Sequence, residues 1–327
     1  MASTVLVVPG FCDLQVNGFA GVDFNDPATA PEDVARAAAA MEATGVTSFL
    51  PTLISSDLPR FAACAKRVLS SGAPGILGLH MEGPYIASDE GPRGAHDPAA
   101  MTAASPDDFA RRQDAADGMI RLVTLAPEVP GVLDLIDRLV GSGVRVAIGH
   151  TAASPETIVE AVRRGATLST HLGNGCASTL PRHPNLLWEQ LADDALHASF
   201  IADGHHLSAS TLRAMVRAKS PARSLLVTDA TAAAASRPGE YTLGTRRVRF
   251  GTDGRVTLTD GARLAGSALT LDAAVGHVVR SAGVTVEEAV AMASSQPAAY
   301  LGVRPRGTVH AEWDAVSARL RIVRVVA

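Results

Sequence analysis

Cysteine is scarce in this sequence. The three that occur, Cys12, Cys64 and Cys176, are far apart and form no CxxC pair. A disulfide framework normally requires an even set of cysteines at regular spacings, and free thiols are typical of a reducing compartment. The cysteine content therefore predicts a cytoplasmic protein without disulfide bonds.

Long apolar runs and clusters of positive charge are also missing. No uninterrupted apolar segment reaches the roughly 18 residues that a membrane-spanning helix needs. The N-terminus, MASTVLVVPGF, lacks the charged and apolar regions of a signal peptide. Lysine occurs only at Lys66 and Lys219, and the net charge is −4 without a basic block. Neither nucleic acid nor a membrane is therefore expected as a partner.

The sequence does have the composition of a globular protein. Of its 327 residues, 47% are hydrophobic and 19% are charged, which excludes the disordered class. This length is sufficient for one large domain, or for a large domain with a small appendage.

Short apolar segments alternate with Ala-rich segments in which apolar residues recur at intervals of three and four. The predicted strands are Val5–Val8 continuing into Phe11–Val16, Val46–Leu53, Ile76–Met81, Ile120–Leu125, Val144–Gly149, Thr167–His171, His197–Ala202 and Ser224–Thr228. The predicted helices between them include Pro31–Thr44, Leu58–Ser71, Val132–Ser142, Pro155–Arg164 and Ser208–Ala218. Eight such repeats indicate an α/β fold, a (β/α)8 TIM-like barrel. A doubly wound sheet is the alternative, but no GxGxxG follows the first strand.

The strand–helix alternation changes after Asp229. Residues Glu240–Leu264 form short alternating runs rich in Thr, Arg and Gly, which predict hairpins, and Leu320–Val326 is again strand-like. We assign the catalytic barrel with its C-terminal helices to residues 8–235 and 262–304. The remaining segments, 1–7, 236–261 and 305–327, are assigned to a small β appendage.

Three residues at predicted strand ends are candidate metal ligands: Glu82 in HMEGP, His150 in AIGHT and His171 in STHLGN. A closed barrel brings the ends of its strands to one face, so these side chains would converge. One carboxylate and two imidazoles leave a coordination position open for water, which is the catalytic pattern for zinc-like metals. Taken singly, each residue would have an ordinary place in the core or at the surface.

Asp229 in LLVTDAT is a fourth polar residue at a strand end. Its carboxylate suits proton transfer at the attacking water, although a helix N-cap is its ordinary alternative. Together with the three candidate ligands it predicts metal-assisted hydrolysis. Gln15 and Asn17 follow the first strand where a second metal would need histidines. Amides are poorer ligands for such ions, so one divalent metal per subunit is predicted.

His96, His206 and Arg182 carry hydrogen-bond donors or positive charge that suit a polarised carbonyl or a phosphate. On their own they would be ordinary exposed residues. Asn174 in HLGNG is similarly compatible with a simple turn.

Eight motifs occur in a fixed order along the chain: PGFCDLQVNGFAGVDFND, GLHMEGPYI, GPRGAHDP, IGHT, THLGNG, IADGHHL, LVTDAT and GSALTLDAAV. From about Val8 to about Val303, the chain resembles the N-acetylglucosamine-6-phosphate deacetylases of the amidohydrolase superfamily. Each motif alone is weak, whereas eight in register are specific. A longer stretch precedes PGF in that family, and HAEWDAVSARLRIVRVVA replaces its Gly-rich closing hairpin. Either the start site is misassigned or the β appendage is reduced.

The resemblance implies roles for the residues at the strand ends. It implies that Glu82, His150 and His171 bind zinc or iron. It also implies that Asp229 deprotonates the attacking water and later protonates the leaving amine, and that His96 hydrogen-bonds the acetyl group.

On the substrate side, the resemblance implies that Asn174 and the backbone of Gly175 hold the sugar phosphate and that His206 contributes at the sugar. It further implies a homodimer in which Arg182 reaches the phosphate in the neighbouring subunit. Gln15 and Asn17 match the members of the family that carry one metal.

The predicted reaction is hydrolysis of N-acetyl-D-glucosamine 6-phosphate to D-glucosamine 6-phosphate and acetate in amino-sugar catabolism. The alternatives are the galactosamine epimer, a different amidohydrolase whose substrate lacks a phosphate, and a sugar-phosphate-binding paralogue without turnover. The presence of all four residues at the strand ends argues against the last of these. Zinc is the predicted metal, with iron, cobalt and manganese as alternatives that the same ligands accommodate.

Overall fold

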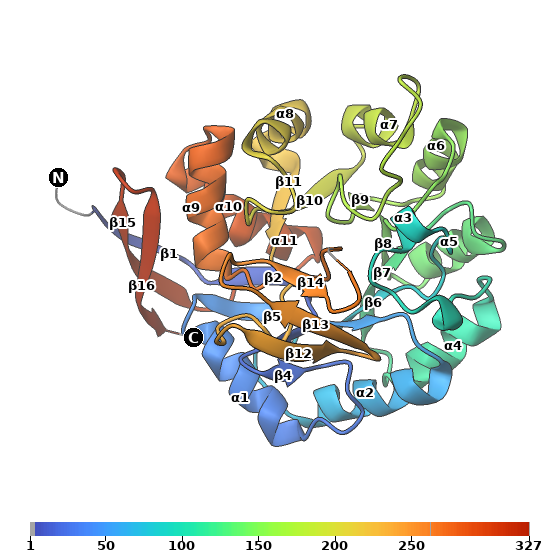
Figure 1. Ribbon diagram of the computed structural model, residues 1–327, viewed down its shortest axis with the longest axis horizontal. Coiled ribbons are helices and arrows are strands. Elements are labelled where there is room, and N and C mark those ends of the chain that lie inside the picture. Colours follow the sequence, from blue (N-terminus) through green and yellow to red (C-terminus); the bar gives the residue numbers. More distant parts are fainter. Residues whose placement is uncertain (1–3, 262, 327) are drawn as a thin grey trace.

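A computed structural model describes residues 4–261 and 263–326 of the protein. An eight-stranded parallel sheet forms its centre (Figure 1). Its strands are β2 (Phe11–Val16), β5 (Val46–Ile54), β6 (Leu79–Glu82), β7 (Ile120–Leu125), β8 (Arg145–Ile148), β9 (Leu168–Ser169), β10 (His197–Ile201) and β11 (Ser224–Val227). A parallel bridge between Val16 and Ala230 brings the chain after β11 back to β2, where the Asp229 N–H donates to the Gln15 carbonyl at 2.9 Å. The sheet is thus nearly closed into a barrel, which confirms the predicted fold class.

Helices surround the barrel (Figure 1), as expected from the apolar periodicity. They are α1 (Pro31–Glu42), α2 (Leu58–Ser70), α4 (Pro106–Ala115), α5 (Val132–Gly141), α6 (Pro155–Arg163), α7 (Leu186–Ala192), α8 (Ala209–Lys219), α9 (Leu271–Ala282), α10 (Val286–Ala293) and α11 (Ser295–Tyr300). The α5 helix buries Val132, Leu135, Ile136 and Leu139 on one face. Ser154 caps α6 by accepting from the Thr157 N–H at 3.3 Å, which satisfies a donor that the helix leaves free.

The first predicted strand is divided between two sheets. Strand β1 (Thr4–Pro9) leaves the barrel and pairs antiparallel with β15 (Thr308–Asp314), which in turn pairs with β16 (Arg319–Val326). Gly10 separates β1 from β2, and a Cβ there would lie 2.2 Å from both the Arg306 carbonyl oxygen and Thr47 Oγ1. The chain therefore changes direction at a point where no side chain fits. We call this three-stranded sheet the terminal sheet.

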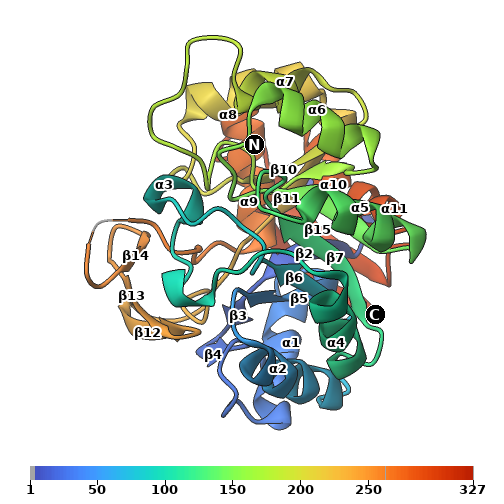
Figure 2. The ribbon, with the colours of Figure 1, turned by 90° about the vertical axis from the view of Figure 1, so that its right-hand side faces the viewer.

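A second antiparallel sheet lies over the mouth of the barrel in Figure 1 and to one side of it in Figure 2. It consists of β12 (Gly239–Leu243), β13 (Arg246–Phe250) and β14 (Val256–Leu258), and we call it the inserted sheet. It packs around its own small apolar cluster, which includes Leu243, Val248, Val256 and Leu258, whereas the terminal sheet packs on the main core. The segments predicted to form one appendage are thus two separate sheets; the domain boundaries themselves stay a prediction.

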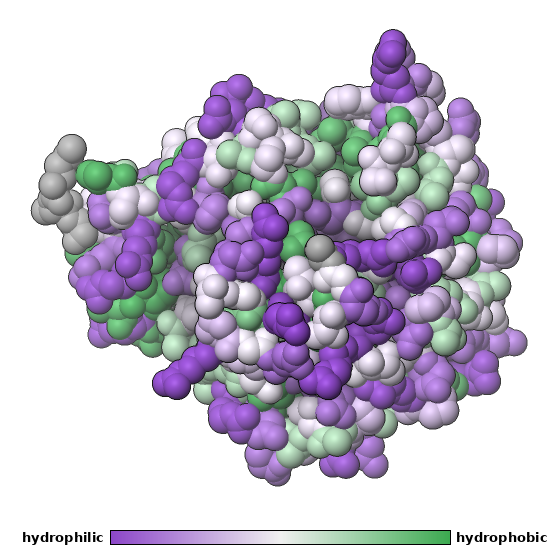
Figure 3. Space-filling view, viewed as in Figure 1, coloured by the Kyte–Doolittle hydropathy of each residue, from purple (hydrophilic) through white to green (hydrophobic). Residues whose placement is uncertain are grey.

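The surface in Figure 3 mixes hydrophilic and apolar side chains, with apolar atoms gathered over the terminal sheet at its left. Val5, Val7 and Val323 on that sheet are each more than half exposed. Among the helices of the described residues, none has the length and apolar character to cross a membrane. Cys12, Cys64 and Cys176 are all unpaired.

Candidate metal centre and active site

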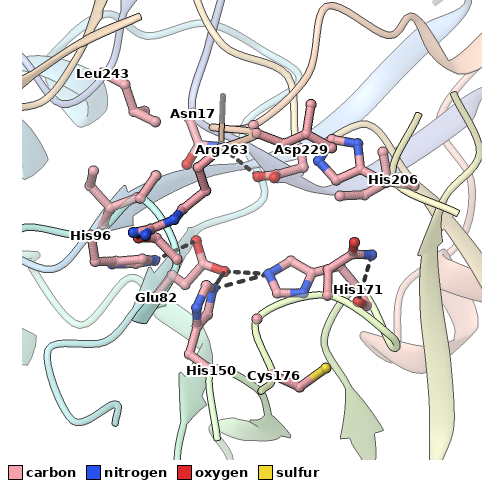
Figure 4. A pocket seen from close by; sticks show the side chains of 18 of the residues that line it. Asn17, Glu82, His96, His150, His171, Cys176, His206, Asp229, Leu243 and Arg263 are labelled. Carbon is pink, nitrogen blue, oxygen red and sulfur yellow. Dashed lines mark hydrogen bonds and ion pairs between the residues drawn. The ribbon is translucent and has the colours of Figure 1, made fainter. Parts of the chain in front are cut away.

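The ends of the barrel strands surround a cavity of about 330 Å³ (Figure 4). Glu82 is the last residue of β6, while His150, His171 and Asp229 follow β8, β9 and β11 within two residues of their ends. All four side chains line this cavity. Residues far apart in the sequence are therefore brought together at the C-terminal mouth of the barrel, where enzymes of this fold place their active sites.

Glu82, His150 and His171 form a compact, buried cluster. The Glu82 Oε1 atom lies 3.1 Å from the Nε2 atoms of both histidines, and these two nitrogens are 3.1 Å apart. The His150 Nδ1–H donates to the Pro92 carbonyl at 2.8 Å, which directs the Nε2 lone pair of this ring into the cluster. One carboxylate and two imidazoles of this geometry fit a divalent metal ion.

The charge state of Glu82 also fits a cation site. Burial acts to raise the pKa of this carboxyl, but the adjacent His150 and His171 rings outweigh burial and hold the pKa well below its ordinary value. In addition, Gln15 donates from Nε2 to Glu82 Oε1 at 2.8 Å. Glu82 is therefore an ionised carboxylate, which is the form that binds a metal.

The backbone is strained where these side chains begin. His150, His171 and Asp229 have φ values of 51°, 31° and 50°, in the left-handed region that residues other than glycine rarely adopt. Gly175 leaves space beside them, since a Cβ there would lie 2.9 Å from His150 Nδ1. Strain of this kind clusters at functional sites, where the surrounding structure holds the side chains in position.

Asp229 lies across the cavity from the cluster (Figure 4). Its Oδ1 atom accepts from Asn17 Nδ2 at 2.6 Å, which fixes the direction of the carboxylate. Burial and the negative charge of Glu82 raise the pKa of Asp229 to about 6. Gln15 and Asn17, considered in the sequence only as poor metal ligands, thus hydrogen-bond two carboxylates of the site. Their alternate spacing on β2 and just beyond it is the signal that places both at the cavity.

His96 comes from the segment after the short helix α3 (Glu90–Arg93). Its ring meets the His150 ring edge-on with 4.4 Å between the centroids, and its Nε2 lies 3.7 Å from Glu82 Oε2. Burial and the neighbouring His150 lower the pKa of His96 to about 3, so the ring is neutral around pH 7. A neutral imidazole beside the metal cluster can donate one hydrogen bond to a bound ligand.

The predicted substrate-side residues occupy different places. Asn174, Gly175 and His206 line the cavity, whereas Arg182 is exposed in the loop between β9 and α7 and is not among the lining residues. The His206 ring is oriented by Asp203, whose Oδ2 is 2.7 Å from its Nδ1. Burial would raise the pKa of Asp203, but the hydrogen bond from His206 and other contacts lower it to about 2. Asp203, absent from the predicted set, is therefore an ionised partner for His206.

The inserted sheet forms one wall of the cavity through Leu243 and the following segment with Arg263. Arg263 Nη1 donates to the Gly94 carbonyl at 3.1 Å, and Nη2 pairs with Glu90. Thr245 Oγ1 also donates to Asp97 Oδ2 at 2.9 Å. The inserted sheet thus holds the segment that carries His96. The sequence contained no signal for this contact, because Arg263 stands among other arginines of an apparently exposed hairpin.

The sequence is similar to a known family and to named deacetylases over most of its length. Residues 6–317 match the Amidohydrolase family. The chain is 37% identical over 328 residues to an N-acetylglucosamine-6-phosphate deacetylase of Bos taurus, covering 95% of this chain and 78% of that protein. It is 35% identical over 303 residues to an N-acetylgalactosamine-6-phosphate deacetylase of Escherichia coli O157:H7, covering 91% and 78%.

A similar solved structure is that of a substitution variant of N-acetyl-D-glucosamine-6-phosphate deacetylase from Mycobacterium smegmatis, in complex with N-acetyl-D-glucosamine-6-phosphate. It has a TM-score of 0.88 and 29% sequence identity, with 98% of this chain and 86% of that chain covered. The similarity therefore extends over nearly the whole length of this chain.

Proposed function

This chain belongs to the amidohydrolase family, and we propose that it hydrolyses N-acetyl-D-glucosamine 6-phosphate to D-glucosamine 6-phosphate and acetate, in amino-sugar catabolism. The observation that carries the proposal is the convergence of the buried Glu82–His150–His171 cluster with Asp229 in one cavity. The choice of substrate is supported by the names of its relatives in cattle and in Mycobacterium smegmatis.

We propose that Glu82, His150 and His171 hold one divalent metal per subunit, and that this metal is zinc. Iron, cobalt and manganese are the alternatives, since a set of one carboxylate and two imidazoles accommodates each of them. When bound, the metal would supply an activated water molecule and polarise the amide carbonyl.

Asp229 acts on the protons of the reaction. Its ionised carboxylate, oriented by Asn17, accepts a proton from the attacking water as the water oxygen bonds to the acetyl carbon. It then delivers that proton to the sugar nitrogen as the carbon–nitrogen bond breaks, so acetate and a free amine leave. The raised pKa of Asp229, about 6, suits a group that both takes up and releases a proton near neutral pH.

His96 and the opposite side of the cavity position the substrate. The neutral His96 ring donates from Nε2 to the acetyl oxygen, where negative charge develops during attack. Asn174, the backbone of Gly175 and the Asp203-oriented His206 contact the sugar phosphate. These roles are supported by the position of each residue in the cavity wall.

We further propose a cytoplasmic homodimer in which Arg182 reaches the phosphate in the partner's cavity. Arg182 is exposed and lies in the loop beside α7, away from the cavity of its own chain. The nearby Trp188 side chain is also exposed and donates from Nε1 to the Arg182 carbonyl at 3.2 Å, which holds this loop against the helix. Dimerisation would cover both side chains.

The test is acetate release from N-acetylglucosamine 6-phosphate by the metal-reconstituted protein, with Asp229→Asn measured in parallel. The variant keeps the shape of the side chain but removes its proton transfer, so we expect kcat to fall about 10²–10⁴-fold with unchanged metal content. Folded, metal-replete wild-type protein that releases no acetate from any N-acetylhexosamine 6-phosphate would refute the proposal.

N-acetylgalactosamine 6-phosphate is the second candidate substrate, because the relative in Escherichia coli O157:H7 is named for it. The two sugars differ only in the direction of one hydroxyl group, so both can place the acetamide at the metal cluster. The ratio of kcat/KM values for the two sugars decides between them.

A further inference from the structure

Ser55 joins the strand end that carries Glu82 to the ring of His96. It directly follows β5, is buried, and places its Oγ atom 2.9 Å from His96 Nδ1 and 3.4 Å from the Glu82 carbonyl oxygen. Gly83 leaves the space for this hydroxyl, since a Cβ on Gly83 would lie 2.1 Å from Oγ. The hydroxyl is therefore confined to one position between a candidate metal ligand and His96.

The contacts of Ser55 determine which nitrogen of His96 carries the proton. The Ser55 backbone N–H points at His96 Nδ1 at 3.4 Å, and a backbone N–H can only donate a hydrogen bond. Nδ1 must then be the acceptor. In a neutral imidazole with an unprotonated Nδ1, the proton is on Nε2.

The contacts of the Ser55 hydroxyl also favour an unprotonated His96 Nδ1. Its single proton can go to His96 Nδ1 at 2.9 Å or to the Glu82 carbonyl at 3.4 Å, and the shorter contact is the stronger hydrogen bond. The opposite tautomer would set an Nδ1–H against the Ser55 N–H and would turn the Nε2 lone pair toward the cavity. That lone pair would repel a carbonyl oxygen.

We infer that Ser55 is a positioning residue that holds His96 in its Nε2–H tautomer and thereby directs a hydrogen-bond donor at the acetyl oxygen. The consequence for catalysis rests on the proposed function, whereas the tautomer itself does not. Loss of the hydroxyl leaves only the long backbone contact to orient the ring. The effect should appear in kcat, because the donor matters most when charge develops on the acetyl oxygen.

The test uses zinc-loaded protein labelled with ¹⁵N in its histidines. Long-range ¹H–¹⁵N correlation spectra show which ring nitrogen is protonated, and His96→Asn identifies the signals of His96. We expect a proton on Nε2 in the wild type, a mixture of tautomers in Ser55→Ala, and the wild-type pattern in Ser55→Thr. Acetate release by Ser55→Ala should show kcat about 10- to 100-fold lower with little change in KM, and Ser55→Thr should restore most of it.

A wild-type spectrum with the proton on Nδ1 overturns the inference, whether or not the protein turns over substrate. Unchanged kcat in Ser55→Ala overturns the catalytic part of it. Should Ser55→Ala not fold, the wild-type spectrum and Ser55→Thr still decide the outcome. A wild type with the expected tautomer but no acetate release supports the inference and refutes the proposed function, so the two failures are distinguishable.

Discussion

The site is built from two regions that differ in how firmly they are held. The strand ends carry Glu82, His150, His171 and Asp229, all buried and continuous with the hydrogen-bonded barrel. The opposite wall comes from the α3 segment and the inserted sheet, and depends on side-chain contacts such as that of Arg263, which is about one-third exposed. The candidate metal ligands and Asp229 thus stand on the hydrogen-bonded barrel, whereas His96 stands on the wall.

Substitutions at the strand ends should lower the rate of acetate release the most. In His171→Ala, one of three candidate ligands is lost, and we expect the purified protein to lose its metal and its activity together. Loss of the metal removes several kcal/mol of transition-state stabilisation, or about 10³- to 10⁴-fold in rate. Metal analysis and acetate release measure the two effects. His310→Ala on the terminal sheet is the matched control and should keep both. A His171→Ala protein with a full complement of tightly bound metal would contradict the assignment.

Substitution of His96 in the wall should lower the rate less than loss of a metal ligand, and it should leave the pH dependence set by Asp229 unchanged. Asp229 acts as a base only when ionised, so kcat/KM should rise with pH through its pKa and level off above it. Burial and Glu82 raise the pKa of Asp229 to about 6, and a bound cation would act in the opposite direction. His96 is already neutral in this range because burial lowers its pKa to about 3. We therefore expect His96→Asn to lower the plateau value of kcat/KM about 10²- to 10³-fold. The pH at which kcat/KM rises on the acidic side should stay unchanged.

The pH–rate profiles of wild type and His96→Asn on the same substrate measure this difference. A shift of the acidic limb in the variant would mean that His96 itself titrates in the reaction. The separation between a strand-end base and a neutral wall donor would then fail.

The same division explains how much could be predicted from the sequence. Apolar periodicity located the eight barrel strands and five of the helices around them, and each of these five helices ends within two residues of its predicted end. Because the barrel brings its strand ends together, a polar residue after each strand was enough to place Glu82, His150, His171 and Asp229 around one cavity. Local sequence patterns were sufficient to predict these residues because the barrel fold itself brings the strand ends together.

Contacts between non-repeating segments could not be predicted in this way. Asp203, Ser55 and Arg263 reach the site or its residues through side-chain contacts whose partners lie 3, 41 and 169 residues away. Strand β1 was joined to β2 in the prediction because both are apolar and adjacent. Its transfer to the terminal sheet depends on packing at Gly10 and on pairing with β15, more than 290 residues further along the chain.

The smallest effect should come from Arg263, which links the inserted sheet to the segment that carries His96. Its ion pair with Glu90 is largely exposed and contributes little by itself, whereas its hydrogen bond to the Gly94 carbonyl holds the backbone two residues before His96. We expect Arg263→Ala to lower kcat/KM by about threefold to tenfold, the cost of one hydrogen bond of about 1 kcal/mol. Hydrogen exchange of residues 90–97 should become faster while that of β6 stays unchanged. Arg249 lies in the same sheet, and its one ion pair among the described residues is with Glu240, so Arg249→Ala should leave both quantities unaltered. If hydrogen exchange of residues 90–97 is the same in both variants, the wall keeps its shape without Arg263. The strand ends and the wall would then be held equally firmly.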